Sequence, residues 1–208
     1  MTSAVLVACA VDREVSSWAR RPGVETVVTG VGPVEAASAV ARALAQRNYR
    51  LVVNAGIAGA FDGAARVGDG IIVAEDAFEL SLEDGRPISL PGGQTVVNAA
   101  RSDSALVARL GAKGFACLRG VTVSRVTSTE ETAERLAVAG AQAESMEGFA
   151  VLRACERAGV RAIELRGISN RVGSRERSGW NFDAGLAGLE LVARALFEIV
   201  DAAGIQSA

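Results

Sequence analysis

The sequence of 208 residues contains no histidine. This absence excludes serine–histidine triads, histidine general bases and the usual histidine metal sites. If the protein performs acid–base chemistry near neutral pH, carboxylates must therefore carry it, helped by positioned waters.

Cysteine and lysine are scarce as well. The three cysteines, Cys9, Cys117 and Cys155, are an odd and widely spaced set that forms neither a zinc pattern nor a disulfide framework. Such usage is typical of a reducing compartment, so we expect a cytoplasmic protein. Lys113 is the single lysine, and a net charge of −2 offers no general attraction to nucleic acid or to acidic membranes.

Long hydrophobic runs are also missing, and no stretch is both long and apolar enough to span a bilayer. The apolar start, Met1 to Ala10, has no basic leader, and charged residues follow it. This pattern favours a first buried strand over a secretion signal.

Aromatic residues make up only 4% of the chain, whereas hydrophobic residues make up 50%. The core must therefore be built from small aliphatic side chains, which suits helices packed on a sheet. The length allows one sizeable domain, residues 1–208. Alternating strands and helices favour a three-layer α/β/α domain with a central, mostly parallel (mixed) sheet. The predicted strands are 4–10, 24–29, 51–54, 67–77, 116–126 and 161–169; the predicted helices are 12–20, 34–47, 104–110, 130–137, 147–158 and 183–202; residues 80–98 form a long loop, a candidate lid.

The first glycine motif is Gly30-x-Gly32, between a predicted strand and a predicted helix. It invites a dinucleotide-binding interpretation, but Glu35 stands where that fingerprint requires its third glycine. We therefore favour a tight strand-to-helix turn, with Pro33 in the first turn of the helix.

The second glycine motif, Gly56 to Gly59, ends the predicted strand 51–54. Glycine there permits a positive φ and lets a ligand approach bare backbone closely. A crowded turn explains the same residues equally well, so the local sequence leaves both interpretations open.

Polar residues follow other predicted strands. Glu147 begins an otherwise apolar helix, and Arg166 to Asn170 close an apolar strand. Open α/β folds bind ligands at the carboxyl ends of their strands, where one cavity could hold these side chains together with Glu14. The alternatives are a helix cap or dipole partner at Glu147, a surface ion pair at Arg166, and turn chemistry near Asn170.

Taken together, these motifs resemble the nucleoside phosphorylase/hydrolase superfamily, and within it the nucleosidase branch that includes methylthioadenosine/S-adenosylhomocysteine nucleosidase. The Met-Glu and Arg-x-Ile-Ser matches are the more specific, because their spacing and order both agree. The continuation from Arg166 to Trp180 is similar to the futalosine hydrolases, which release hypoxanthine from futalosine in an alternative menaquinone pathway. The resemblance spans nearly the whole chain through Ala-Val-Asp-Arg-Glu14-Val, Thr-Gly-Val-Gly32, Asn-Ala-Gly56-Ile-Ala-Gly-Ala-Phe, Val-Gly-Asp69-Gly-Ile-Ile-Val, Ser-Met-Glu147-Gly and Arg166-Gly-Ile-Ser-Asn170.

The resemblance implies a role for each motif. Glu14 would be the general base that activates a water, and Glu147 would bind the ribose hydroxyls and favour the developing ribosyl cation. Arg166 would help to hold Glu147 and the water, and Asn170 would complete the catalytic set beside the base. The implied substrate-binding residues are Ile57, Ala58, Gly59, Val126, Thr127, Ser128, Thr129, Ser145, Met146 and Ser169.

The chain departs from its relatives at two positions. Asn170 stands where the adenine-directed nucleosidases have aspartate, and an amide offers a donor and an acceptor together, which suits a 6-oxopurine. Ile57 stands where those nucleosidases have a serine near the water. The arginine-bearing phosphate loops of the phosphorolytic relatives are also not apparent, so water is the expected nucleophile.

We therefore expect an N-ribosyl hydrolase that acts on futalosine without a cofactor or a metal. Its partner would be a small nucleoside rather than nucleic acid or a membrane, and it would form a homo-oligomer, a dimer or a multiple of dimers. Two alternatives stay open. A methylthioadenosine/S-adenosylhomocysteine nucleosidase is disfavoured by Asn170, and a non-catalytic nucleoside-binding protein by the joint presence of Glu14, Glu147 and Arg166.

Overall fold

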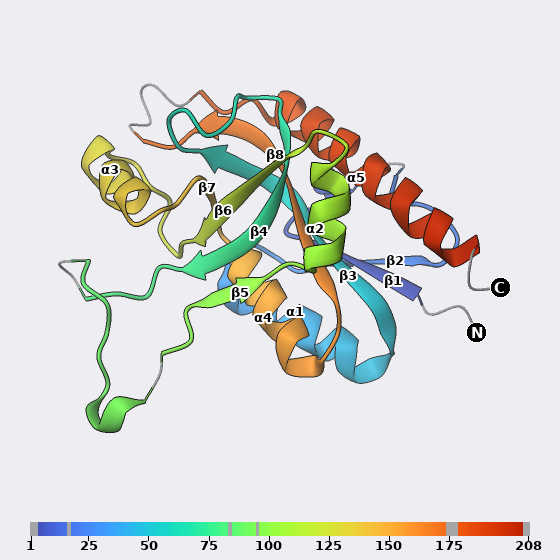
Figure 1. The fold of residues 1–208 in the computed structure, drawn as a ribbon, viewed down its shortest axis with the longest axis horizontal. Helices are drawn as coiled ribbons and strands as arrows, with labels where there is room; N and C mark the ends of the chain where they lie inside the picture. The colour runs from blue at the N-terminus through green and yellow to red at the C-terminus, as the bar shows by residue number, and fades with distance from the viewer. Residues whose placement is uncertain (1–3, 16–17, 83–84, 95, 174–178, 206–208) are drawn as a thin grey trace.

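The structure is a computed structural model that describes residues 4–15, 18–82, 85–94, 96–173 and 179–205. Within these described residues, eight strands carry much of the buried chain, and five α-helices pack around them (Figure 1). The strands are β1 (Ala4–Cys9), β2 (Val24–Val28), β3 (Tyr49–Ala60), β4 (Gly70–Phe78), β5 (Ala99–Arg101), β6 (Ala116–Thr122), β7 (Ala143–Ser145) and β8 (Ala162–Arg171). The helices are α1 (Pro33–Gln46), α2 (Ser104–Gly111), α3 (Glu130–Val138), α4 (Gly148–Ala158) and α5 (Phe182–Ile205), with short 3₁₀ turns η1 (Asp12–Glu14) and η2 (Pro91–Gly93).

The sheet is mixed and mostly parallel, as the sequence predicts. Strands β2, β1, β3 and β8 run parallel to one another, and β4 runs parallel to β6, which in turn runs parallel to β7. The antiparallel pairs are β3 with β7, β4 with β8 and β4 with β5. Because β3 pairs with both β7 and β8, the strands β3, β8, β4, β6 and β7 close on themselves, and β7 and β8 lie on opposite sides of β3.

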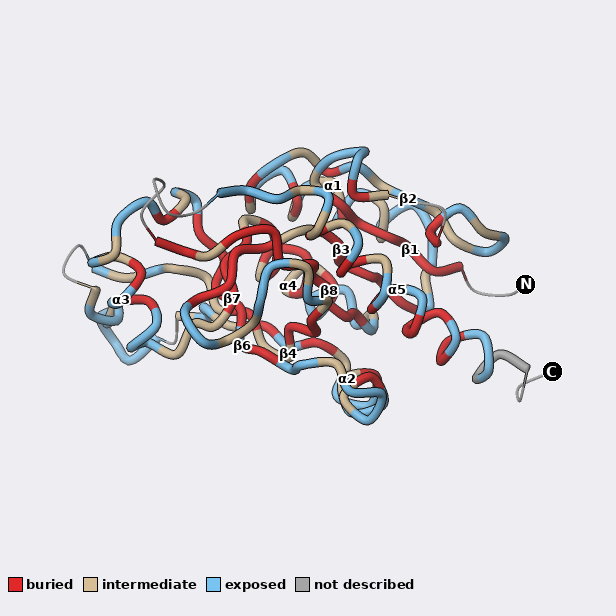
Figure 2. Tube along the Cα trace, turned by 90° about the horizontal axis from the view of Figure 1, so that it is seen from above, coloured by how far each residue is buried: buried red, intermediate tan, exposed pale blue. Residues whose placement is uncertain are grey.

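Helices cover both faces of the sheet. Helix α5 packs on one face with α2 beside it, and α1 and α4 pack together on the other (Figure 1). The sidedness is visible along β1, where Val5 and Val7 join the α5 side of the core and Leu6 and Ala8 join the α1/α4 side. Figure 2 shows the buried trace along the central strands and exposed residues on the outer sides of the helices. These contacts confirm the predicted α/β class.

Several predicted elements differ from the structure. The predicted helix over 12–20 is wrong at its start, where only a 3₁₀ turn at Asp12–Glu14 forms and Val15 is already extended. The Glu14 carboxylate accepts hydrogen bonds from the backbone amides of Ala10 and Val11, which fixes this turn tightly against the end of β1. Strands β5 and β7 are three residues long, and such short segments show too little alternation to be predicted.

The turn between β2 and α1 confirms the interpretation of the first glycine motif. Gly30 and Gly32 have φ values of 89° and 101°, which lie in the region that favours glycine, and Pro33 begins α1. Among the described residues, no helix combines the length and the apolar character needed to cross a membrane.

Candidate active site

A cavity of about 150 Å³ lies at the carboxyl ends of β1 and β3, beside β7 and the end of β8. Most of the site residues predicted from the sequence lie around it, although they come from separate segments of the chain. The lining consists of Ala10, Val11, Glu14, Val31, Ile57, Ala58, Gly59, Val126, Glu144, Ser145, Met146, Glu147, Ser169, Asn170, Trp180 and Phe182.

Glu14 is a buried carboxylate held entirely by backbone donors. Its Oε2 accepts from the amides of Ala10 (2.9 Å) and Val11 (3.2 Å), and its Oε1 accepts from the amide of Ile57 (3.0 Å). Since a carboxylate oxygen has two lone pairs, Oε1 keeps one for a further donor. Burial raises the pKa of Glu14 above its ordinary value, although the Ile57 amide and the Arg166 guanidinium act against that rise.

Glu147 is the second carboxylate of the cavity, and it precedes α4 as the N-cap residue. Its Oε1 accepts a hydrogen bond of 2.9 Å from the amide of Gly32, so the turn between β2 and α1 fixes its orientation. Its Oε2 lies 3.9 Å from Nη1 of Arg166, which is an ion pair but not a hydrogen bond. This second oxygen therefore remains free to accept hydrogen bonds from a ligand.

Arg166 is not part of the cavity lining; it lies fully buried behind the carboxylates. Its Nε donates to Oε1 of Glu164 at 2.8 Å, and its Nη1 is directed toward Glu147. Burial acts to lower the pKa of the guanidinium, but the surrounding charges of Glu164, Glu147 and Glu14 raise it, so Arg166 stays charged. One cation thus compensates several buried carboxylates.

Two further buried carboxyl groups, Glu164 and Asp76, complete this cluster, and the sequence analysis did not single out either. Burial, followed by the charge of Glu164, raises the pKa of Asp76, whereas the Thr122 hydroxyl donates to its Oδ1 at 2.6 Å. Burial also raises the pKa of Glu164, while Arg166 opposes that rise. The only available signal in the sequence was the presence of acidic residues inside two apolar strands, Glu75 and Asp76 in β4 and Glu164 in β8.

The second glycine motif is neither a turn nor a segment with positive φ. Strand β3 continues through it to Ala60, and neither Gly56 nor Gly59 has a positive φ. A Cβ on Gly56 would lie 2.5 Å from Nη1 of Arg166 and 2.8 Å from Oε1 of Glu14. The expectation of positive φ is therefore wrong, and the close approach that glycine permits is that of the protein's own charged side chains.

Asn170 and Ser169 lie at the end of β8 with their side chains joined. The Ser169 hydroxyl donates to Oδ1 of Asn170 at 2.8 Å, and Nδ2 of Asn170 donates to the carbonyl of Arg171 at 3.0 Å. These two bonds fix the orientation of the amide. One N–H of the amide and one lone pair of its oxygen are left for a ligand.

Glu144, on β7, is a third carboxylate in the lining and was missed in the sequence. It is buried, and both of its oxygens are held by Thr127: the backbone amide donates to Oε1 at 3.1 Å, and the hydroxyl donates to Oε2. Burial raises the pKa of Glu144, and these two donors act against the rise. Thr127 therefore supports the site from behind Glu144 and does not line it.

Of the other predicted substrate-binding residues in 126–129, Val126 lines the cavity, whereas Ser128 and Thr129 do not. Ser128 is exposed, and Thr129 caps α3 by accepting from the amide of Thr132. The predicted lid over 80–98 contributes no described residue to the lining either. The cavity instead has an aromatic side formed by Trp180 and Phe182, whose rings lie 5.4 Å apart. Part of the sequence motif that ends at Trp180, residues 174–178, lies outside the described residues.

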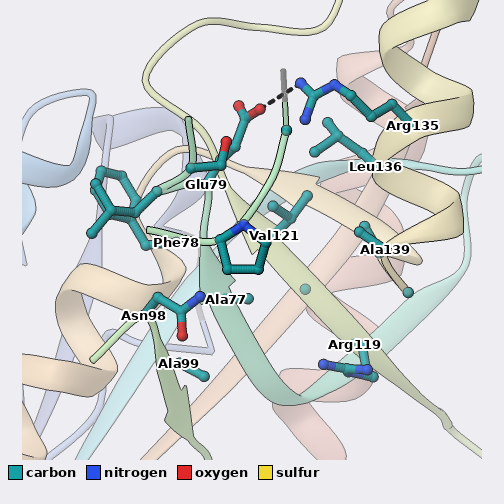
Figure 3. A pocket seen from close by; sticks show the side chains of 17 residues that line it. Ala77, Phe78, Glu79, Asn98, Ala99, Arg119, Val121, Arg135, Leu136 and Ala139 are labelled. Atoms are coloured by element: carbon teal, nitrogen blue, oxygen red, sulfur yellow. Dashed lines mark hydrogen bonds and ion pairs between the residues drawn. The ribbon is translucent and has the colours of Figure 1, made fainter. Parts of the chain in front are cut away.

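A larger hollow of about 310 Å³ lies between α3 and the segment after β4 (Figure 3). Its lining is mainly apolar, with Phe78, Val121 and Leu136, and an ion pair of 2.6 Å joins Glu79 to Arg135 at its rim. None of the clustered carboxylates lines it, so it offers no comparable acid–base chemistry.

Comparison with known proteins gives a consistent result. A family model described as the phosphorylase superfamily matches residues 22–203. The futalosine hydrolase of Acidothermus cellulolyticus is 41% identical over 177 residues, which cover 80% of this chain and 72% of that protein. The futalosine hydrolase of Thermus thermophilus is 34% identical over 177 residues, which cover 81% and 78%. The same fold occurs in the 5′-methylthioadenosine/S-adenosylhomocysteine nucleosidase of Colwellia psychrerythraea, whose structure was solved in complex with adenine. The TM-score is 0.77 at 20% sequence identity, and the match covers 95% of this chain and 96% of that chain.

Proposed function

The chain belongs to the phosphorylase superfamily, and from this premise we propose that it is a futalosine hydrolase. It cleaves the N-glycosidic bond of futalosine with water and releases hypoxanthine and dehypoxanthine futalosine, a step of menaquinone biosynthesis. The observation that carries this proposal is the placement of Glu14 and Glu147 in one cavity, with Arg166 behind both.

Glu14 is the general base of this reaction. Three backbone amides fix its carboxylate, and the remaining lone pair of Oε1 accepts a hydrogen bond from the attacking water. The raised pKa of Glu14 brings its basicity closer to neutral pH, which favours proton transfer from the water. The sequence contains no histidine that could replace it.

Glu147 acts on the sugar. Its free Oε2 accepts hydrogen bonds from the ribose hydroxyls, and its negative charge stabilises the ribosyl cation that develops as the bond to the base breaks. Met146 lies next to it in the lining and packs beside the ribose. The Arg166 guanidinium lies behind the two carboxylates and compensates their charge.

Water, rather than phosphate, is the nucleophile. The described lining residues include no arginine and no lysine, so nothing among them compensates the charge of a phosphate ion next to Glu14 and Glu147. Arg13, which precedes Glu14, does not line the cavity either. Its side chain is exposed, and its Nη2 lies 3.9 Å from Oδ1 of Asp183.

The base is a 6-oxopurine. The bonds from Ser169 and to Arg171 leave the Asn170 amide one donor and one acceptor. These serve the mixed donors and acceptors of hypoxanthine, and the Asn170 side chain itself carries no charge. The rival activity, on methylthioadenosine or S-adenosylhomocysteine, requires an adenine, which has a different edge pattern.

The enzyme acts as a cytoplasmic homo-oligomer, a dimer or a multiple of dimers. Large apolar side chains are exposed in the segment between β4 and β5, and a contact with a second copy would bury them. This apolar segment consists of Leu80, Leu82, Leu90 and Val97.

The proposal predicts a clear substrate preference. Purified protein incubated separately with futalosine, its 6-amino counterpart and methylthioadenosine should release hypoxanthine from futalosine fastest, and chromatography of the free bases measures this. Faster release of adenine would favour the nucleosidase alternative. No turnover of any of the three would favour the non-catalytic binding protein.

A further inference from the structure

Glu144 is a buried carboxylate that lines the cavity, and the mechanism proposed above assigns it no role. It lies on β7, is only 8% exposed, and lines the cavity together with Asn170 and Gly59. Its two oxygens accept only from Thr127, and no ion pair joins it to an arginine or lysine among the described residues. Each oxygen therefore keeps one lone pair for a donor in the cavity, and further donors stabilise a buried carboxylate that no cation pairs with.

The sheet register places Glu144 and Asn170 on either side of Gly59. Glu144 is the partner of Gly59 across the β3–β7 pair, and Asn170 is its partner across the β3–β8 pair. Residues directly opposite one another in a sheet share a face, so both side chains stand on the cavity side. Their Cα atoms are two strand spacings apart, about 10 Å, and the glycine between them leaves bare backbone as the floor. A flat base lying over Gly59 would meet the Asn170 amide at one edge and the Glu144 carboxylate at another.

The two side chains offer different chemistry to that base. Asn170 keeps one N–H, a donor that fits an acceptor such as the 6-oxo oxygen or ring nitrogen 7. Glu144 offers acceptors only. A 6-oxopurine carries a hydrogen on ring nitrogen 1, whereas a 6-aminopurine carries a lone pair there. Glu144 therefore complements the first base and repels the second.

We propose that Glu144 is a specificity-determining residue that accepts a hydrogen bond from the ring N1–H of a 6-oxopurine and thereby excludes 6-aminopurines. Thr127 is its positioning residue, since its amide and hydroxyl fix both carboxylate oxygens. This inference rests on the proposed function for the identity of the base, but the recognition of the base is separate from the hydrolysis of the bond.

The test is the binding of free bases, because it needs no turnover. Calorimetry with hypoxanthine and with adenine gives the ratio of their Kd values for the wild type and for Glu144→Gln, which keeps the shape of the side chain. A glutamine amide can present either a donor or an acceptor, so the preference for hypoxanthine should fall by about tenfold to a hundredfold. Thr127→Val should shift the ratio in the same direction by less, because it removes one of the two donors that hold Glu144.

Glu79→Gln is the matched control. It removes a nearby negative charge that lies outside the cavity and is paired with Arg135, so the ratio of Kd values should match the wild type. An unchanged ratio in Glu144→Gln, or a wild type that binds the two bases equally, would overturn the inference. A wild type that prefers hypoxanthine through Glu144 but does not cleave futalosine would instead overturn the proposed function and leave the assignment of Glu144 in place.

Discussion

Glu14→Gln is expected to bind futalosine with nearly unchanged affinity and to hydrolyse it about 100- to 10,000-fold more slowly than the wild type. The single oxygen of the glutamine can still accept from the amides of Ala10 and Val11, so the turn after β1 should persist although the hydrogen bond from the Ile57 amide is lost. It cannot take the proton of the attacking water. Single-turnover kinetics and calorimetric binding of futalosine separate these two effects.

The pH dependence provides an independent check on Glu14. Since the base must be ionised, kcat/KM of the wild type should fall as the pH drops through the pKa of Glu14, which burial raises above the ordinary glutamate value. The residual activity of Glu14→Gln should lack this acidic limb. Glu198→Gln, an exposed residue paired with Lys113, controls for the loss of a carboxylate and should behave as the wild type. Near-normal hydrolysis by Glu14→Gln would remove Glu14 from the mechanism.

The second large effect is expected at Arg166, on stability. Arg166→Met should lower the free energy of unfolding by about 3–5 kcal/mol, because it leaves the buried carboxylates of Glu164 and Glu147 without a compensating charge. Arg161→Met is the matched control, because Arg161 forms an exposed ion pair with Asp103 and such pairs contribute about 0–1 kcal/mol. Urea unfolding monitored by circular dichroism measures both variants.

A double variant identifies the cause of this loss. If uncompensated charge destabilises Arg166→Met, then Arg166→Met with Glu164→Gln should be more stable than Arg166→Met alone, since one buried charge has been removed with its partner. This comparison also applies if the single variant is too unstable to purify. A double variant no more stable than the single one would show that lost packing, not charge, causes the effect.

The sequence predicted the α/β class and much of the site because both depend on order along the chain. Apolar strands alternate with amphipathic helices. Glu14 follows β1, Glu147 follows β7 and Asn170 lies near the end of β8, and all three line one cavity. The sequence also indicated the tight turn at Gly32 correctly, because glycine followed by proline is a strong local signal.

Other features depend on contacts between distant segments and leave no local signal. The need for glycine at position 56 comes from Arg166 and Glu14, which approach it from other parts of the chain. The local sequence therefore could not distinguish its strand conformation from a turn. Glu144 was missed because its strand, β7, is three residues long and its role depends on pairing with Gly59. The helix predicted after β1 failed because hydrogen bonds to the Glu14 side chain replace the helical pattern there.

The most direct test of the central claim is to identify the products formed from futalosine in the presence and absence of inorganic phosphate. Chromatography with mass detection should find hypoxanthine and the free sugar product at the same rate in both conditions, since Glu14 activates water and no described cation of the lining compensates a phosphate. A sugar 1-phosphate, or a rate that rises with phosphate, would contradict the assignment of the protein as a hydrolase.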